Sequence, residues 1–315
     1  MKQILSILAV ALTALCGLAA CSHEDDPEYS PCMVCSPADT APAHPDSPLW
    51  ARHHGSALKI LAIGNSFTIN ACHYLPMLIS ELDGDSICIA RLTRSGCSLS
   101  QHWESHISGA PDYDLYYSDG GEWVKSEIKT LDEALCLLDW DIVTFQQASY
   151  LSGIWRSYQP YLEYLSRLCR ETHPGVKLGW HYTWAYRPGT QHDGFAAYDW
   201  DSEKMHQAII EAGDLASEGM EYKLHSATLI HDMRKAYPEV ENQFSEDGYH
   251  ISNPTALLAI TMLWHDTLIE PKNGVSSIAD PVYPADVDSE SFLRALDILR
   301  QMHSPGGSSV PMLFE

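Results

Sequence analysis

A serine and an aspartate–histidine pair are the residues of this sequence best suited to nucleophilic chemistry. Ser66 ends a Gly-Asn-Ser segment that directly follows the apolar run 58–63, and Asp247 and His250 are separated by two residues near the other end of the chain. In a loop, this spacing lets the carboxylate accept a hydrogen bond from histidine Nδ1, which leaves Nε2 to take the proton of a serine hydroxyl. The three side chains could therefore form a Ser-His-Asp triad.

Each part of this triad also has a structural interpretation. Ser66 stands where a serine commonly caps the helix that follows a strand. Asp247 and His250 could be solvated side chains, as acidic and histidine residues beside helices often are. The case for chemistry therefore depends on both segments occurring in one chain.

Alternating strands and helices must position these residues. Apolar runs predict buried strands, and helical periodicity predicts amphipathic helices between them. The predicted strands cover 58–63, 87–92, 141–145, 176–182 and 222–227, and the predicted helices cover 74–82, 125–138, 158–169, 203–216, 255–269 and 289–302. A β-ribbon is expected over 113–124, beside the sheet. This order predicts an α/β fold, a three-layer α/β/α sandwich with a central, mostly parallel five-stranded sheet of the flavodoxin-like type.

Together these segments resemble the SGNH (GDSL-like) hydrolase superfamily, in particular a branch found in exported bacterial lipoproteins. The likeness spans residues 58–269 and is carried by Gly64-Asn65-Ser66 after the first strand, Gly96 after the second, and Asp247-x-x-His250. The resemblance implies the SGNH type of fold and a serine esterase. It implies that Ser66 is the nucleophile, His250 the base and Asp247 the acid that orients the histidine.

The resemblance also implies an oxyanion hole, in which the backbone N–H groups of Ser66 and Gly96 are two donors. The superfamily places an asparagine amide after the third strand, where this chain has Gln146-Gln147. A glutamine amide can donate the same hydrogen bond from one methylene further away, and Gln146 is nearer the strand end. The alternative is a polar strand cap. Asn65 replaces the aspartate of the Gly-Asp-Ser motif, which the branch tolerates because this position is not the nucleophile.

Residues that follow the fourth predicted strand are candidates to line the mouth of the site. They are His181, Trp184, Tyr186 and Arg187, and Asn65 is a further candidate. Such side chains could stack on a sugar or form hydrogen bonds with it, whereas the alternative is aromatic packing beside an exposed arginine. The histidines show no metal-ligand spacing and the chain has no phosphate loop, so we predict neither a metal nor another cofactor.

The N-terminal segment predicts export and lipid attachment. Residues 1–21 combine Lys2, an apolar run and a Leu-Ala-Ala-Cys sequence that resembles a bacterial lipobox. We therefore expect Cys21 to be acylated and to anchor the protein at the outer membrane, on its periplasmic or cell-surface face. An ordinary secretory signal is the alternative. The acidic run 24–26 fits surface display as well as a solvated linker.

The remaining composition defines the domains and the partners. Residues 22–56 are poor in apolar side chains and should form a flexible tether to a hydrolase domain over 57–303, which a tail over 304–315 follows. The formal net charge of −23 repels phosphate backbones and anionic membranes, so we expect no nucleic-acid partner and no membrane contact except through the lipid anchor.

The cysteines divide between the tether and the domain. Cys32 and Cys35 could close a small disulfide loop in an oxidising compartment. The other cysteines lie in apolar patterned segments and are expected as small core residues, namely Cys72, Cys88, Cys97, Cys136 and Cys169.

Three functions fit these features. The first is an esterase that removes O-acyl groups such as acetyl from carbohydrate, with a small-molecule or polysaccharide ester as substrate. The second is a lipid-active esterase or lysophospholipase of the same fold, which would prefer long acyl chains. The third is a non-catalytic glycan-binding lipoprotein, for which Asn65 and the glutamine pair are the best arguments.

Overall fold

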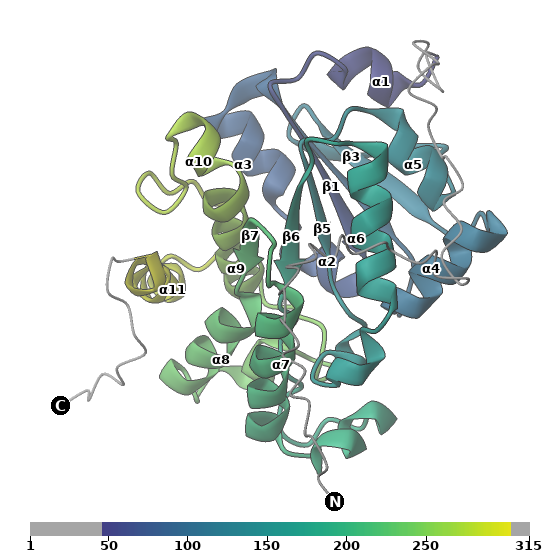
Figure 1. Ribbon diagram of the computed structural model, residues 1–315. Coiled ribbons are helices and arrows are strands. Elements are labelled where there is room, and N and C mark those ends of the chain that lie inside the picture. The colour runs from purple at the N-terminus through teal and green to yellow at the C-terminus, as the bar shows by residue number, and fades with distance from the viewer. Residues whose placement is uncertain (1–45, 304–315) are drawn as a thin grey trace, which may run out of the picture. The chain divides into compact units, whose positions relative to one another are not determined.

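The computed structural model of the protein describes residues 46–303, except for the side chains at positions 85 and 241 (Figure 1). The predicted signal segment 1–21 with Cys21, the residues Cys32 and Cys35, and the tail 304–315 lie outside these residues. No helix within the described range is long and apolar enough to cross a lipid bilayer.

The core of the domain is a sheet with strand order β4-β3-β2-β1-β5-β6-β7. The strands are β1 (Leu58–Gly64), β2 (Ile87–Thr93), β3 (Asp114–Asp119), β4 (Glu122–Lys125), β5 (Ile142–Phe145), β6 (Lys177–His181) and β7 (Tyr222–Leu224). Strands β2, β1, β5, β6 and β7 run parallel, as predicted. The ribbon expected at 113–124 beside a five-stranded sheet is instead part of the sheet. Strand β3 pairs antiparallel with β2, so β3 and β4 extend the sheet to seven strands.

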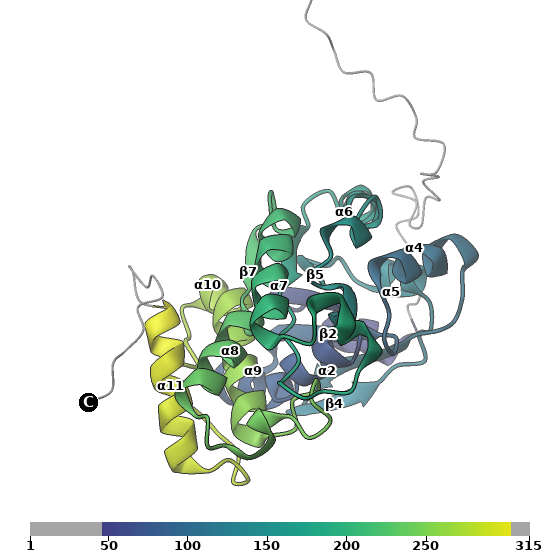
Figure 2. The ribbon, with the colours of Figure 1, turned by 90° about the horizontal axis from the view of Figure 1, so that it is seen from below.

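Helices cover both faces of the sheet, which confirms the predicted three layers (Figures 1 and 2). The helices are α1 (Pro48–His53), α2 (Ser66–Ala71), α3 (Leu75–Leu82), α4 (Leu99–Ser108), α5 (Leu131–Leu137), α6 (Tyr161–Thr172), α7 (Ser202–Ala216), α8 (Ser226–Ala236), α9 (Pro254–Leu268), α10 (Glu270–Asn273) and α11 (Ser289–His303). Helices α2 and α3 contact α9 in one layer, while α4 and α5 contact α6 in the other. Helices α8 and α11 pack on α9 and on each other.

Helix α9 shows why the sequence folds this way. Asn253 caps it by accepting a hydrogen bond from the N–H of Ala256, and Pro254 occupies its first turn. Nearly all of its residues are buried, because α2, α3, α8 and α11 surround it. The sequence predicted this helix and its cap, but α4 was missed although Ser98 and Gln101 form a capping box at its start.

Two expectations were wrong, one about where the tether ends and one about Cys136. The predicted tether ends earlier than expected, because Pro48–His53 forms helix α1, in which Leu49 is fully buried. Arg52 of α1 also forms an ion pair with Asp119 of β3. Cys136 is half-buried and disulfide-bonded, not a free core cysteine. The four other cysteines of the domain are free and buried as expected.

Candidate active site

The structure brings Ser66, Asp247 and His250 into one chain of hydrogen bonds. Ser66 is the first residue of α2, directly after the carboxyl end of β1. Its Oγ lies 2.7 Å from His250 Nε2, and His250 Nδ1 lies 2.7 Å from Asp247 Oδ2. Both Ser66 and His250 are partly exposed. The arrangement has the order nucleophile, base and orienting acid that acyl transfer requires.

The loop around Asp247 fixes its carboxylate and keeps it ionised. Oδ1 accepts hydrogen bonds from the N–H groups of Tyr249 at 2.9 Å and His250 at 2.8 Å, while Oδ2 faces the imidazole ring. Burial raises the pKa of Asp247, but these hydrogen bonds outweigh it, and the pKa lies below its ordinary value. A carboxylate held in this way favours the tautomer of His250 that leaves Nε2 free to accept the serine proton.

Asn65 fixes the turn that presents Ser66. Its Oδ1 accepts a hydrogen bond from the N–H of Phe67 at 3.0 Å, so Asn65, and not Ser66, caps α2. Its Nδ2 donates to the carbonyl of Cys97 at 3.1 Å, which ties the turn to the loop after β2. Asn65 is only 2% exposed, so the prediction that it lines the mouth of the site was wrong.

Both glutamine amides point away from the place predicted for them. Gln146 Nε2 donates to Asn65 Oδ1 at 2.7 Å, and Gln147 Nε2 donates to the carbonyl and the hydroxyl of Ser157, each at 3.1 Å. Both side chains are buried. Because both amides donate to other partners inside the protein, the expectation that a glutamine amide reaches the oxyanion was wrong. Gln146 supports Asn65 instead.

Two backbone N–H groups remain candidates for the oxyanion hole. Ser66 is the first residue of α2, where an N–H has no acceptor within the helix. Gly96 lies in the turn after β2 with φ of 62°, is exposed, and forms no hydrogen bond through its N–H within the described part of the chain. The hydrogen bond from Asn65 to Cys97 holds this turn beside Ser66.

The residues predicted to line the mouth of the site are mostly buried. The exposed fraction is 1% for His181 and 0% for Trp184 and Tyr186, so their rings cannot stack on a substrate. His181 packs in the core, where its ring contacts that of Trp264. Only Arg187 is partly exposed, and its guanidinium is directed at the protein backbone.

Arg187 and its neighbours hold the loop that carries Asp247 and His250. Arg187 Nε donates to the carbonyl of Ser245 at 3.0 Å, and its Nη2 donates to that of Glu246 at 3.2 Å. The indole of Trp184 donates to the carbonyl of Tyr249 at 2.6 Å. Residues 184–187, which we call the clamp segment, therefore fix the backbone of the catalytic loop, residues 245–250. Three side-chain donors of the clamp segment reach carbonyls on both sides of Asp247.

Sequence reasoning missed a row of half-buried aromatic rings beside the site. The ring centroid of Tyr249 lies 4.4 Å from that of His250, that of His192 lies 5.3 Å from Tyr249, and that of Tyr150 lies 6.0 Å from His192. None of the three is fully buried. The position of Tyr249 between Asp247 and His250 was the one signal in the sequence, whereas the loop positions of His192 and Tyr150 gave none.

No cluster of three or more His, Cys, Asp or Glu side chains placed to hold a metal ion occurs among residues 46–303.

Comparison with known protein families and structures places the chain among domains without an assigned activity. The model of a domain of unknown function, DUF4886, matches residues 59–291. A crystal structure of a DUF4886 family protein from Bacteroides uniformis is 28% identical, covers 80% of this chain and 97% of its own, and has a TM-score of 0.72. The search of curated proteins found no significant match.

Two more distant structures carry names of enzymes. A protein from Slackia heliotrinireducens described as a candidate SGNH hydrolase is 19% identical, covers 67% of this chain and 99% of its own, and has a TM-score of 0.43. A catalytic variant of an acetylxylan esterase from Geobacillus stearothermophilus is 12% identical, covers 67% of this chain and 94% of its own, and has a TM-score of 0.40.

Proposed function

The chain belongs to the DUF4886 family, a domain of unknown function, and we propose that it is a serine ester hydrolase in which Ser66 is the nucleophile. The observation that carries this proposal is the continuous chain of hydrogen bonds from Ser66 through His250 to Asp247, each 2.7 Å long. A serine that only capped its helix would not require a histidine at its Oγ, and Asn65 already supplies the cap.

The proposed mechanism assigns one step to each group. His250 Nε2 takes the proton of Ser66 as Oγ attacks the ester carbonyl, and Asp247 stabilises the imidazolium that results. The N–H groups of Ser66 and Gly96 donate to the oxyanion. The tetrahedral intermediate then expels the alcohol, which takes the proton from His250. Water, deprotonated by the same histidine, attacks the acyl-serine and releases the acid.

We propose carbohydrate O-acyl groups, such as acetyl esters, as the substrate. The support is the row of half-buried rings formed by Tyr249, His192 and Tyr150, which leads away from His250. Aromatic rings at a site can pack on the apolar face of a sugar while polar groups contact its hydroxyls. The rings replace the buried His181, Trp184 and Tyr186 in the substrate-binding role predicted from the sequence.

Hydrolysis assays with the purified protein test both parts of the proposal. We expect release of acetate from p-nitrophenyl acetate and from acetylated oligosaccharides. Ser66→Ala should lose essentially all of this activity, whereas Ser95→Ala, a matched serine of the loop after β2, should keep it. Unchanged activity in Ser66→Ala would refute the mechanism. Preference for long-chain p-nitrophenyl esters over acetyl esters would favour a lipid-active esterase and refute the carbohydrate assignment.

We also propose that Cys21 carries a lipid that anchors the exported protein at the outer membrane. The support is the Leu-Ala-Ala-Cys sequence after the apolar N-terminal run. Cells grown with a labelled fatty acid should incorporate it into the wild-type chain but not into Cys21→Ser. Equal labelling of the two chains would contradict the anchor.

A further inference from the structure

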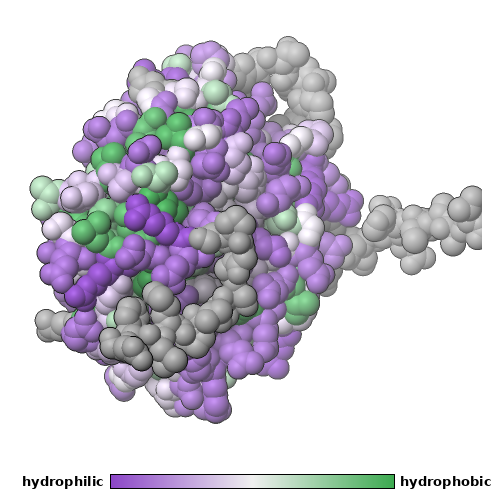
Figure 3. Space-filling view, turned by 90° about the vertical axis from the view of Figure 1, so that its left-hand side faces the viewer, coloured by the Kyte–Doolittle hydropathy of each residue, from purple (hydrophilic) through white to green (hydrophobic). Residues whose placement is uncertain are grey.

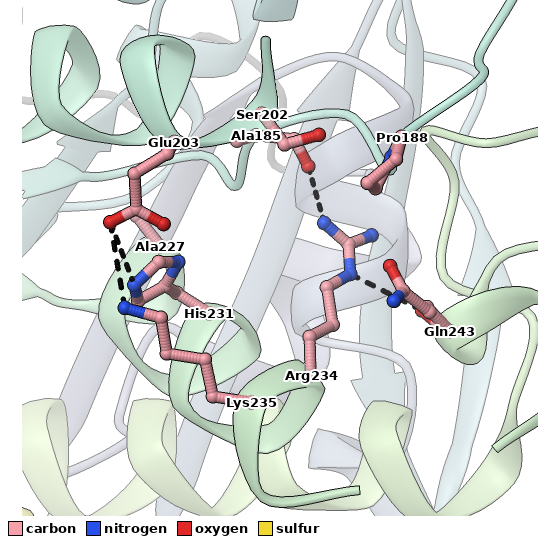
Figure 4. A pocket seen from close by; sticks show the side chains of 9 residues that line it. All are labelled: Ala185, Pro188, Ser202, Glu203, Ala227, His231, Arg234, Lys235 and Gln243. Carbon is pink, nitrogen blue, oxygen red and sulfur yellow. Dashed lines mark hydrogen bonds and ion pairs between the residues drawn. The ribbon is translucent and has the colours of Figure 1, made fainter. Parts of the chain in front are cut away.

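A pocket of about 140 Å³ lies between α7 and α8, and Ala185, Pro188 and Gln243 also line it (Figure 4). Arg234, His231 and Lys235 of α8 line it together with Glu203 of α7. Its volume exceeds that of one water molecule, which takes about 30 Å³ in the liquid, several-fold. The proposed esterase mechanism uses none of these side chains.

The guanidinium of Arg234 is not fully satisfied by the protein. Nη1 donates to the carbonyl of Ala185 at 2.7 Å, and Nε donates to that of Gln243 at 3.2 Å. Nη2 is buried and has no hydrogen-bond partner among the described residues, and Figure 4 draws no hydrogen bond or ion pair from it to the pocket residues. Arg234 thus has two hydrogen bonds that orient the guanidinium, and a third donor, Nη2, that no described residue uses.

The charge of Arg234 also lacks a partner. No carboxylate of a described residue forms an ion pair with it, whereas burial and then the charge of Arg187 lower the pKa of Arg234 to about 10. A buried charge of this kind is costly unless an opposite charge or a set of hydrogen bonds compensates it. A bound anion would supply both.

The other charges of the pocket do not cancel that of Arg234. The carboxylate of Glu203 lies 3.5 Å from Lys235 Nζ and 3.5 Å from His231 Nε2, so its charge is balanced by Lys235. Burial lowers the pKa of His231, which is then a neutral hydrogen-bonding group near pH 7. One uncompensated positive charge remains, at Arg234.

We propose that this pocket is a binding site for a carboxylate, whose oxygens accept hydrogen bonds from Arg234 Nη2. A carboxylate oxygen accepts a strong, charge-assisted hydrogen bond from a guanidinium N–H. The volume fits a small organic acid or the carboxylate end of an acidic sugar. This inference does not depend on the proposed esterase activity.

Isothermal titration calorimetry of the full chain with D-glucuronate, acetate and neutral D-glucose tests the proposal. We expect D-glucuronate or acetate to bind and D-glucose not to bind. Binding of both anions identifies a site for small acids in general, and binding of D-glucuronate alone identifies a site for acidic sugars. Equal behaviour of D-glucuronate and D-glucose, with no binding of acetate, would overturn the proposal.

Variants locate the site. Arg234→Gln should weaken carboxylate binding at least tenfold, because it removes the uncompensated positive charge. Lys235→Glu should weaken it about tenfold, because it leaves the carboxylate of Glu203 unbalanced and adds a second one beside it. Lys204→Glu is the matched control, since Lys204 is an exposed lysine of α7 that pairs with Asp199 outside the pocket. Arg234 also holds two loops through its hydrogen bonds, so Arg234→Gln could unfold the protein, which circular dichroism would detect. In that case the result for Lys235→Glu decides the test. Carboxylate binding that Lys235→Glu leaves unchanged would refute the assignment, and so would unchanged binding in a folded Arg234→Gln.

Labelling of Ser66 by a fluorophosphonate, which reports the esterase site, is expected to be the same in wild type and Lys235→Glu.

Discussion

At the scale of the residue, the carboxylate of Asp247 has one role that no neutral side chain can replace. It accepts hydrogen bonds from two backbone N–H groups and from the ring of His250. An amide at this position would place an N–H opposite His250 or force the other tautomer of the imidazole, and it would remove the charge that stabilises the imidazolium.

We therefore expect Asp247→Asn to lower kcat by about 10³- to 10⁴-fold with little change in KM. The measurement is steady-state hydrolysis of p-nitrophenyl acetate. Asp214→Asn is the control, because Asp214 lies in α7 and accepts its hydrogen bond from Tyr182, which is not part of the triad. A loss of less than tenfold in Asp247→Asn would remove Asp247 from the mechanism.

Asn65 explains at the same scale why this chain has asparagine where the Gly-Asp-Ser motif has aspartate. A carboxylate could still accept from Phe67 and Gln146, but its second oxygen would face the carbonyl of Cys97 without a proton to share. Asn65→Asp should lower the free energy of unfolding by about 1–3 kcal/mol, as measured by urea denaturation.

Asn70→Asp is the matched control for this change. The side chain of Asn70 accepts a hydrogen bond from Ile251 through its oxygen, which a carboxylate can do equally well. Its effect should stay within about 0.5 kcal/mol. Equal destabilisation by the two substitutions would show that the donor function of Asn65 is unimportant.

At the scale of the element, the segment after β6 positions the catalytic loop through backbone carbonyls. Arg187→Met removes two of the hydrogen bonds that fix this loop but leaves Ser66, His250 and the aromatic rings in place. We expect kcat to fall about 10- to 100-fold, because a small displacement of the base disrupts proton transfer, while KM changes little.

The kinetics of Arg187→Met and of Arg300→Met, an exposed arginine of α11, would be compared on p-nitrophenyl acetate. If Arg187 only stabilised the fold, Arg187→Met would lower the melting temperature without a selective fall in kcat relative to KM. That outcome, or an unchanged kcat, would contradict the proposal that Arg187 positions the catalytic loop.

The elements themselves were largely predictable from the sequence, and their side-chain directions were not. The buried strands β1 and β2 and the capped helix α9 have local signals, namely continuous apolar runs and an Asn-Pro start. Trp184 and Arg187 were expected to line the mouth of the site. Their part in it was wrong because the face to which a loop residue turns depends on tertiary packing, which no local pattern encodes.

The site shows the same limit. Ser66, Asp247 and His250 stand at motif positions, and the structure brings them together over a separation of 184 residues in sequence. The amides of Gln146 and Gln147 could not be placed, because the direction of each depends on Asn65 and Ser157, which reach them only in the folded chain.

At the scale of the whole molecule, a buried ionic cluster joins segments that are distant in the sequence. His265 of α9 lies 2.9 Å from Asp83 Oδ2 at the end of α3 and 3.0 Å from Asp266 Oδ1. Asp266 in turn accepts hydrogen bonds from Ser277. Burial lowers the pKa of His265, but the two carboxylates outweigh it, and the pKa is raised above its ordinary value.

The raised pKa predicts a pH-dependent stability. A histidine whose pKa is higher in the folded than in the unfolded state adds to the free energy of unfolding. This contribution is fully present below about pH 6.5, and it is lost as the pH rises through the folded-state pKa. The melting temperature of the wild type should therefore exceed that of His265→Gln most at about pH 6, and the difference should narrow as the pH rises towards about 9. A difference that is constant with pH would contradict the assignment of a charged His265.

The most direct measurement of the central claim is reaction of the protein with a fluorophosphonate, followed by mass spectrometry of the labelled peptide. A serine that His250 activates should be phosphonylated, and the label should lie on Ser66 alone. Ser66→Ala should abolish labelling, and His250→Gln should slow it by at least about 10³-fold. A protein that stays unlabelled, or one that labels equally well after either substitution, would show that Ser66 is not a catalytic nucleophile.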